Sequence, residues 1–392
     1  RCRFKLLMTG TSTRNNIAEF FPQLELAYNN SANMISWCRT IYRYDRSNKK
    51  EGVEEGLHEY PNPNFGKPIP PYRKGFRLFS ESHLPEKITV FGVAQRNQDI
   101  FNADELSDIL GRFVITRTFE EVSGKDIKRI RQVPIRFTDS ERFVYRKAIE
   151  EFEKMRSNYF SSTGNMRKDA MMRLIQQITL LLRISAAPNT VHEYTGGTPA
   201  KILKVLNMLD DMRDEIVAIG VRHKIVVNAY AEAIRERFPD RPLFVVTGST
   251  TTLAARRKLR KTLRESNNGI LLCTQQSLPS SVNFEFVDNV IIPELHYNNS
   301  RMSQFYMRFI RYNSTRQKNI YFVTYLGSIE SNQMQMVLAK EKLNLFMRGQ
   351  DTDLDDIYER FGVDYDLLSV LMSREMDENG KMYIKWGEQN IA

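Results

Sequence analysis

Three short runs of β-branched and aromatic residues constrain the fold of this chain most strongly. They cover residues 270–273, 287–292 and 320–325, and polar or helical segments separate them. Runs of this kind are typical of strands buried in a parallel sheet, where both faces are covered. The order strand, loop, strand, helix, strand over residues 269–330 therefore predicts an α/β layer.

A similar alternation precedes this stretch. Residues 224–228 and 243–247 are predicted strands, each followed by a predicted helix, over 230–237 and 252–265. Alternation at this spacing predicts a parallel sheet with right-handed connections.

Ligands of such a sheet bind beyond the carboxyl ends of its strands. Glycine, short hydroxyls and amides occur at these ends, where exposed backbone amides let a phosphate approach closely. The residues predicted on this basis to contact a nucleic-acid backbone are Asn228, Gly248, Ser249, Thr250, Thr274, Gln275, Gln276 and Ser277.

A predicted helix over residues 303–312 carries the most specific cluster. Gln304, Arg308 and Arg311 fall at i, i+4 and i+7 and would share one face. Two forked, permanently charged guanidinium groups one turn apart suit a polyphosphate. Taken alone, however, the solvated face of an amphipathic helix is the more common explanation.

The earlier part of the chain contains further predicted elements. Residues 4–8 form a predicted buried strand, and residues 132–137 form another. Thr138 and Glu141 form a capping box that begins a helix reaching about residue 159. A second apolar helix, over 170–185, ends before a proline, and Thr198 with Pro199 begins a helix that runs to residue 212.

In this order the features resemble the second motor lobe of superfamily 2 helicases, and more narrowly the Swi/Snf-type DNA translocases. The family has Gln, then Gly-Arg, then a second Arg three residues later, and residues 304–311 read QFYMRFIR, with Met307 in place of the glycine. The sequence CTQQSLPSSVNF resembles the family's fifth motif. Asn283 matches its asparagine, and Gln276 lies in a variant that resembles phage and mobile-element relatives.

Two further segments carry the resemblance. Residues 8–12, MTGTS, resemble the third helicase motif, which couples the nucleotide site to the nucleic-acid track through Thr9, Gly10 and Thr11. Without the family, this is only a strand-to-helix turn. Residues 113–122, FVITRTFEEV, resemble the family's Leu-Arg-Arg-Thr-Lys-Glu-Glu-Val, with Arg117 retained as a nucleic-acid contact.

The resemblance implies a function and its cofactors. Arg308 and Arg311 would act on the γ-phosphate of ATP with Gln304 in a supporting role, and Asn283 would join the two arginines in the nucleotide pocket, with Mg²⁺ as the metal. Each Gly-Lys pair in this chain is followed by Pro, Asp or Met, so a phosphate loop is not found, nor are paired acidic residues for Mg²⁺. The chain is therefore expected to be a fragment that begins at the third motif and does not hydrolyse ATP alone.

The expected organisation is a truncated first RecA-like lobe over residues 1–137, a helical insert over 138–197, a complete second lobe over 198–350 and an acidic extension over 351–392. A protrusion inserted over 24–98 is aromatic, basic and turn-rich; it either contacts DNA as a helical element or presents solvated charges. A long helix over 329–348 would end the second lobe. A hairpin turn is predicted around Asp377–Gly380.

Charge is distributed unevenly along the chain. Residues 351–392 contain 11 acidic and 4 basic residues, a net charge of −7, whereas residues 1–350 have a net charge of +17. A body this basic favours a nucleic-acid partner, with a solvated surface as the alternative. The resemblance narrows the partner to the backbone of double-stranded DNA, read without base specificity. The acidic extension would mask basic surface or bind another protein.

Composition excludes several other classes. Three scattered cysteines form neither a disulfide framework nor a zinc site, and no run of 18 apolar residues or signal-peptide layout occurs, so the chain is expected to be cytoplasmic. Two alternatives to the motor remain from the sequence: a DNA-binding or scaffolding lobe that works without hydrolysis, and an RNA helicase. The basic helix over 252–265 is equally consistent with a solvated face and with a DNA-facing one.

Overall fold

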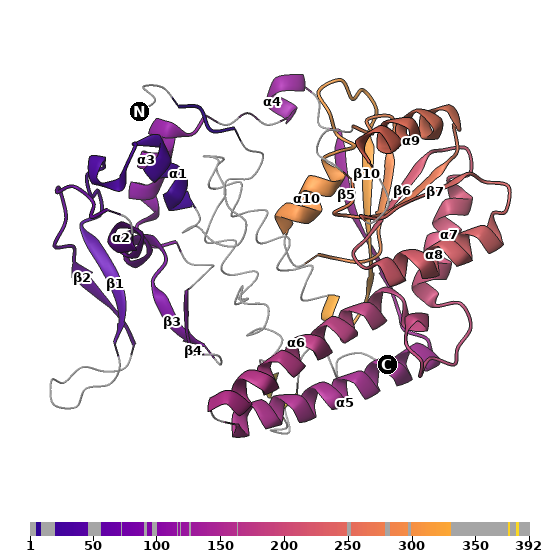
Figure 1. Cartoon of the computed structure of the whole chain (residues 1–392), viewed down its shortest axis with the longest axis horizontal. Coiled ribbons are helices and arrows are strands. Elements are labelled where there is room, and N and C mark those ends of the chain that lie inside the picture. The colour runs from indigo at the N-terminus through magenta and orange to yellow at the C-terminus, as the bar shows by residue number, and fades with distance from the viewer. Residues whose placement is uncertain are drawn as a thin grey trace. The chain divides into compact units, whose positions relative to one another are not determined.

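The computed structural model describes residues 5–8, 20–45, 56–71, 73–89, 92–95, 100–115, 117, 119–124, 127–162, 164–248, 252–278, 283–296, 299–330, 375–376 and 382–383. The chain divides into two compact units (Figure 1). The first contains the residues up to Arg117, and the second is formed mainly by Thr118–Tyr297 and Arg301–Met334. Each unit has a hydrophobic core of its own.

The first unit combines helices with two antiparallel hairpins. Its elements are α1 (Phe21–Ala27), the 3₁₀ turn η2 (Ser31–Asn33), the hairpin of β1 (Thr40–Asp45) and β2 (Gly56–Pro61), α2 (Arg73–His83), the hairpin of β3 (Glu86–Thr89) and β4 (Gly92–Gln95), and α3 (Ala103–Phe113). Phe21, Phe79 and Leu106 are among the residues that form its core. Where the structure describes it, the region 24–98, predicted as an inserted helical protrusion, contains both helices and antiparallel strands.

The predicted strand at residues 4–8 is wrong for the part that the structure describes. Lys5–Met8 has no regular secondary structure, and Leu6 and Met8 are 84% and 87% exposed. A run of apolar residues forms a buried strand only when a neighbouring strand and a covering layer are present. Among the described residues, this segment pairs with no strand, and Lys5 Nζ donates to the backbone oxygen of Leu26 on α1.

A six-stranded parallel sheet forms the centre of the second unit. In chain order the strands are β5 (Lys128–Ile135), β6 (Val217–Val221), β7 (Leu243–Val246), β8 (Ile270–Thr274), β9 (Asn289–Ile292) and β10 (Lys318–Tyr325), and in the sheet they lie in the order β5-β10-β9-β6-β8-β7. Every pairing is parallel. The predicted α/β, RecA-like class is confirmed, and the three predicted runs around 270, 290 and 320 are β8, β9 and β10.

Helices connect and cover these strands. They are α4 (Phe119–Ser123), α7 (Ala200–Asp211), α8 (Lys224–Arg237), α9 (Leu253–Glu265) and α10 (Asn299–Tyr306). The predicted strand at 224–228 is wrong, because these residues begin α8 and the strand is β6, seven residues earlier. Every residue of β6 is buried, whereas Ile225 is 44% exposed, so the sheet takes the first of two adjacent apolar runs.

Strand β5 also differs from its expected place. The sequence assigned it to the end of the first lobe, but it pairs in parallel with β10 along its whole length, from Lys128 opposite Lys318 to Ile135 opposite Tyr325. It is the edge strand of the second unit's sheet.

Two long helices form the helical insert. α5 (Asp139–Ser161) and α6 (Gly164–Ala186) pack lengthwise against each other beside the sheet (Figure 1), and the 3₁₀ turn η3 (Pro188–Thr190) follows. The predicted capping box begins α5: Thr138 N donates to Glu141 Oε2 at 2.7 Å, and Glu141 N donates to Thr138 Oγ1 at 3.5 Å. The helix that follows Pro199 is α7.

Beyond Glu330 the structure describes one short hairpin. β11 (Glu375–Met376) and β12 (Met382–Tyr383) pair antiparallel, which confirms the hairpin predicted around Asp377–Gly380. Of the long helix predicted over 329–348, Ile329 and Glu330 are helical, and residues 331–348 lie outside the described residues. None of the described helices is both long and apolar enough to cross a bilayer.

Candidate functional site

Arg308 and Arg311 lie in the loop that follows α10. The helix ends at Tyr306, and the amides of Arg308 and Phe309 donate to Phe305 O and Tyr306 O, at 3.1 Å each, in tight turns. The prediction that a helix over 303–312 holds Gln304, Arg308 and Arg311 on one face is therefore wrong. Gln304 is on α10 and exposed, while the two arginines belong to the turns beyond it.

Ser314 keeps Arg311 in a turn rather than in a helix. Its hydroxyl accepts the amide of Arg311 at 3.0 Å, and its own amide donates to Arg311 O at 2.7 Å. A serine side chain that takes a backbone amide competes with helical hydrogen bonding. The turn also buries Phe309 and Ile310 at 0% and 4% exposure, which anchors the loop in the core.

A glycine in β6 positions α10 on the sheet. A Cβ atom at Gly220 would lie 2.3 Å from Cε1 of Phe305, so the ring of Phe305 packs directly on the strand backbone. Phe305 is fully buried and meets Phe309 edge-on, with ring centroids 5.4 Å apart. The loop with the two arginines is thereby fixed relative to the strand ends.

Asn283 connects the arginine loop with α9. Its side-chain Oδ1 accepts from Arg311 Nε at 2.8 Å, and its backbone oxygen accepts from Arg260 Nε on α9 at 2.5 Å. The next residue, Phe284, donates its amide to Arg308 O at 3.2 Å. The sequence predicted Asn283, Arg308 and Arg311 as one group, and the structure brings them together, although not on a helical face.

The positive charge of this group is only partly compensated. Glu285 pairs with Arg260 at 2.6 Å. Arg308 Nε is buried and has no hydrogen-bond partner among the described residues. Burial lowers the pKa of Arg308, and the neighbouring charge of Arg311 lowers it further. A buried guanidinium N–H without an acceptor is costly, so the site favours an anion that supplies the missing acceptor.

The loop after β8 lies at the carboxyl end of the sheet, as predicted. Thr274 and Ser277 bond to each other through their hydroxyls, and the exposed Gln276 lies 3.2 Å from His296 through their side-chain nitrogens. Gln275 is buried at 3% exposure, and its amide donates to the backbone oxygens of Gly220 at 3.2 Å and Glu294 at 2.7 Å. Its amide group therefore holds strand ends together, which corrects its expected role as a nucleic-acid contact.

Sequence reasoning missed Glu294, which follows β9. The carboxylate is 3% exposed; Oε2 accepts the amides of Arg222 at 2.6 Å and His223 at 3.1 Å, and Oε1 bonds to His223 Nδ1. The carboxylate of Glu294 thus accepts the backbone amides at the end of β6, to which a phosphate could otherwise bind. An acidic residue directly after a buried run was the available signal.

The remaining predicted contacts are in several places. Gly248 is exposed after β7 and lies beside Ser277, since a Cβ there would be 3.6 Å from Ser277 Oγ. Asn228 is exposed on α8 and does not follow a strand, so the prediction that it lies at a strand end is wrong. Arg117 is an exposed residue of the first unit. Thr9, Gly10, Thr11, Ser249 and Thr250 lie outside the described residues.

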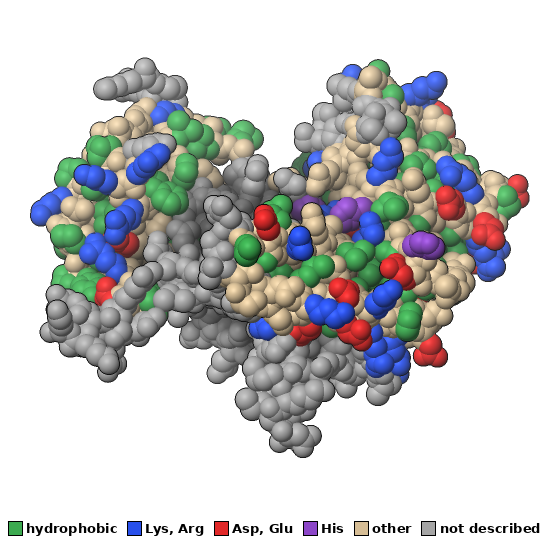
Figure 2. Space-filling model, turned by 60° about the horizontal axis from the view of Figure 1, so that its bottom comes forward, with side chains coloured by type: hydrophobic (Ala, Val, Ile, Leu, Met, Phe, Trp, Pro, Cys, Tyr) green, Lys and Arg blue, Asp and Glu red, His purple; other side chains and the backbone are tan. Residues whose placement is uncertain are grey.

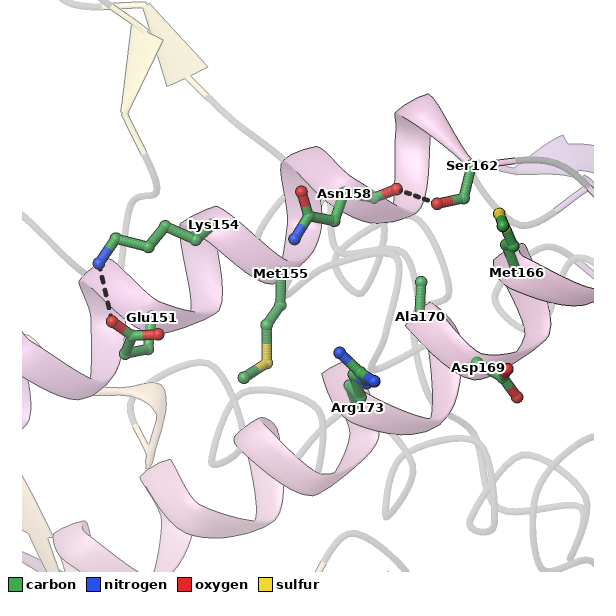
Figure 3. A pocket seen from close by; sticks show the side chains of 9 residues that line it. All are labelled: Glu151, Lys154, Met155, Asn158, Ser162, Met166, Asp169, Ala170 and Arg173. Atoms are coloured by element: carbon green, nitrogen blue, oxygen red, sulfur yellow. Dashed lines mark hydrogen bonds and ion pairs between the residues drawn. The ribbon is translucent and has the colours of Figure 1, made fainter.

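A separate pocket lies between α5 and α6 (Figure 3). It has a volume of about 540 Å³, with Met155 and Met166 among its apolar residues and Lys154 and Arg173 among its charged ones. None of the predicted site residues lines it. In the described part of the chain, no group of three or more His, Cys, Asp or Glu side chains is arranged to hold a metal ion.

Comparisons with known proteins give structural similarities only. No protein-family model matches the chain, and no curated protein matches it. A Sulfolobus solfataricus SWI2/SNF2 ATPase core in complex with double-stranded DNA is similar over 66% of this chain and 56% of that one, with 16% identity and a TM-score of 0.46. The chain therefore spans little more than half the length of that protein.

Two shorter structures are also similar. The C-terminal part of the Fun30 ATPase domain matches over 63% of this chain and 97% of that one, at 14% identity and a TM-score of 0.43. The C-terminal domain of the Sulfolobus solfataricus SWI2/SNF2 ATPase matches over 60% and 100%, at 12% identity and a TM-score of 0.42. These similarities by themselves assign no activity to this chain.

Proposed function

We propose that this chain is part of an ATP-driven translocase of the Swi/Snf type that acts on double-stranded DNA, with the second unit as its second motor lobe. The observation that carries the proposal is the pair Arg308 and Arg311: Asn283 bonds to the Arg311 side chain, the amide of Phe284 bonds to Arg308 O, and Arg308 Nε is buried and unpartnered among the described residues. A site with two forked cations and one missing acceptor fits a phosphoryl group better than it fits any neutral ligand.

Arg308 and Arg311 would bind oxygens of the γ-phosphoryl group of ATP. Hydrolysis increases the charge on these oxygens, and the two guanidinium groups would stabilise it from the second lobe. Asn283 keeps the Arg311 guanidinium oriented, and Gln304, exposed on α10, would support the loop or the attacking water. Mg²⁺ would accompany the nucleotide.

The backbone of double-stranded DNA would bind at the carboxyl end of the sheet. Exposed Gln276 and Gly248, with the hydroxyl of Thr274 nearby, lie at neighbouring strand ends there. Ser277, which was also predicted as a contact, is buried at 5% exposure and bonds to Thr274 instead. Ser249 and Thr250, which follow Gly248 in the sequence, would complete this surface. The basic body of the chain would supply the attraction, so binding would be independent of base sequence and weakened by salt.

The test replaces each arginine by alanine in the intact motor. We expect the DNA-stimulated kcat of ATP hydrolysis to fall by about 10³ or more for either variant, as for the loss of arginine fingers generally, with a small change in KM. Arg316→Ala is the matched control, because Arg316 is an 81% exposed arginine of the same loop that pairs with Asp288 at 3.4 Å. A fall no larger than that of the control would refute the assignment.

Stimulation by different nucleic acids tests the substrate. Duplex DNA, single-stranded DNA and RNA are compared at equal nucleotide concentration in the same ATPase assay. The proposal predicts the strongest stimulation by duplex DNA. Stimulation by RNA alone would identify an RNA helicase, and DNA binding without any hydrolysis in the intact protein would identify a non-hydrolytic lobe.

A further inference from the structure

Helix α9 has a surface on which positive charge is concentrated. Thr252 caps the helix through a hydrogen bond to the Ala255 amide at 3.3 Å, and Leu263 anchors it in the core. Six basic residues and one acidic residue occur along it: Arg256, Arg257, Lys258, Arg260, Lys261, Arg264 and Glu265. The helix thus has a net charge of +5. Its buried residue Leu263 fixes the helix against the core.

Among the basic side chains of α9 that the structure describes, Arg260 and Lys261 have an acidic neighbour. Arg260 is engaged with Glu285, and Lys261 lies 3.8 Å from Glu265 in a pair whose side chains are 79% and 62% exposed. A pair so exposed contributes little. Arg257 and Lys258 are exposed, and within the described ranges no carboxylate lies within ion-pair distance of either.

The spacing of the exposed cations forms a stripe. Arg257, Lys261 and Arg264 are at i, i+4 and i+7, and Lys258 lies one turn before Lys261. We call these four residues the α9 stripe. Seven residues of helix extend about 10 Å, which corresponds to about three base steps measured along the axis of a DNA duplex. The stripe can therefore meet about three consecutive phosphates.

The helix that carries the stripe is connected to the loop with Arg308 and Arg311. Arg260 donates to the backbone oxygen of Asn283, whose side chain holds Arg311, so one residue joins α9 to the arginine loop. Elsewhere on the second unit the charges are mixed: Figure 2 shows acidic and basic side chains interspersed on the face turned toward the viewer. On α5, for example, Lys154 pairs with Glu151 at 2.7 Å.

We propose that the α9 stripe is a second contact surface for double-stranded DNA, separate from the strand-end loops, which binds the phosphates of one strand over about three base steps. This inference rests on the proposed function, because it takes duplex DNA as the partner. Its support is charge complementarity: the stripe presents four exposed cations, of which only Lys261 has an acidic neighbour among the described residues, the highly exposed Glu265. The stripe also lies on the helix that Arg260 and Asn283 connect to the arginine loop.

The test measures the salt dependence of duplex binding. The variant Arg257→Gln/Lys258→Gln/Lys261→Gln keeps residues with good helix propensity and leaves Arg264, whose guanidinium lies 5.9 Å from the centre of the Phe286 ring. Affinity for a duplex of mixed sequence is measured by fluorescence anisotropy from low to moderate salt. Since each phosphate contact contributes about 0.9 to the slope of log K against log salt, we expect the slope to fall by about 2 to 3.

The control variant removes three exposed cations that each have an acidic neighbour: Lys147→Gln/Lys154→Gln/Arg213→Gln. These residues lie near Glu193, Glu151 and Asp210. The change in net charge is the same, and a slope change below about 1 is expected. Equal slopes for the α9 variant and this control would overturn the inference.

Two further outcomes are decisive. An equal fall in slope on duplex RNA of the same length would overturn the assignment to duplex DNA. A wild-type chain that binds no duplex at any salt concentration would overturn the proposed function itself, whereas wild-type binding with an unchanged slope in the α9 variant overturns only the present inference. Circular dichroism of both variants shows whether the helices are retained.

Discussion

At the scale of single residues, Asn283 is the most informative member of the site. The resemblance pointed to it, but only the structure shows that its side chain holds Arg311 while its backbone holds Arg260. The sequence could place these residues in one group because a shared pocket was implied by the motif order. It could not give the contacts, because they join positions 23 and 28 residues away along the chain.

Two substitutions of Asn283 distinguish its role in orienting Arg311 from the effect of a negative charge placed beside Arg311. Asn283→Ala removes the acceptor of Arg311 Nε, and we expect a roughly tenfold lower kcat of DNA-stimulated ATP hydrolysis in the intact motor, in line with about 1–1.5 kcal/mol for one hydrogen bond. Asn283→Asp keeps an acceptor but adds a negative charge beside Arg311. It should weaken ATP binding as well, seen as a raised KM. An Asp variant with wild-type kinetics would contradict this account.

His83 in the first unit predicts a pH dependence of stability. Burial lowers its pKa to about 4, against an ordinary value near 6.5. Its Nδ1 bonds to Phe101 O at 2.9 Å, which assigns the proton to that nitrogen and leaves Nε2 to accept from Trp37 Nε1 at 3.2 Å. Protonation of Nε2 would remove this acceptor.

The sign follows from linkage. The unfolded chain binds a proton at His83 near pH 6.5 and the folded chain near pH 4, so the contribution is complete above pH 6.5 and is lost as the pH falls toward 4. The expected loss in free energy of unfolding is roughly 3 kcal/mol. Urea denaturation at pH 7, 5.5 and 4.5 measures it, and His83→Gln should flatten the dependence. An equally steep dependence in that variant would point to other groups.

At the scale of elements, a strand or helix was predicted correctly where its sequence pattern is typical of only one kind of element. The runs around 270, 290 and 320 are strands, and the capping box of Thr138 and Glu141 begins α5. Residues 217–221 and 224–228 are both short and apolar, and periodicity alone does not separate a buried strand from a helix over such lengths. Strand β6 is buried on both faces between β8 and β9, a tertiary fact that local propensity does not contain.

A buried ion pair connects three elements of the second unit. Lys201 on α7 bonds to both carboxylate oxygens of Glu330, at 2.6 and 2.7 Å, and to Pro293 O at 3.0 Å, and both side chains are almost fully buried. Burial lowers the pKa of Lys201 and raises that of Glu330. The sequence predicted the helix that contains Lys201 but not the partner of its side chain.

We expect Lys201→Met to destabilise the second unit by about 3–5 kcal/mol, because it leaves a carboxylate buried without its cation. The double variant Lys201→Met/Glu330→Leu should recover much of this loss, since well-packed apolar residues often replace a buried pair at little cost. Chemical denaturation of the two variants and of the wild type gives the free energies of unfolding. If the double variant is less stable than the single one, the lysine is not the main compensation for Glu330.

At the scale of the whole molecule, the sequence predicted the kind of fold better than its long-range pairings. Alternating strands and helices imply a parallel sheet, but not that β5 would pair with β10, 190 residues further along the chain. Nor does an apolar pattern show that residues 24–98 form two antiparallel hairpins. Such pairings depend on which strand edges are available in the folded chain, and local sequence does not show this.

The distribution of charge over the chain leads to the last prediction. Residues 1–350 have a net charge of +17, and residues 351–392 reduce the total to +10. Replacing seven of the 11 acidic residues after position 350 by Asn or Gln keeps the length and restores +17. Because attraction to a polyanion depends on the summed charge and is screened over about 10 Å at 0.1 M salt, association with duplex DNA should become several-fold faster at low salt, and the difference should fade as salt increases. Stopped-flow association rates at several salt concentrations measure this. Seven substitutions of uncharged polar residues in the same segment are the control, and an equal rate increase in that control would show that the acidic residues do not act through their charge.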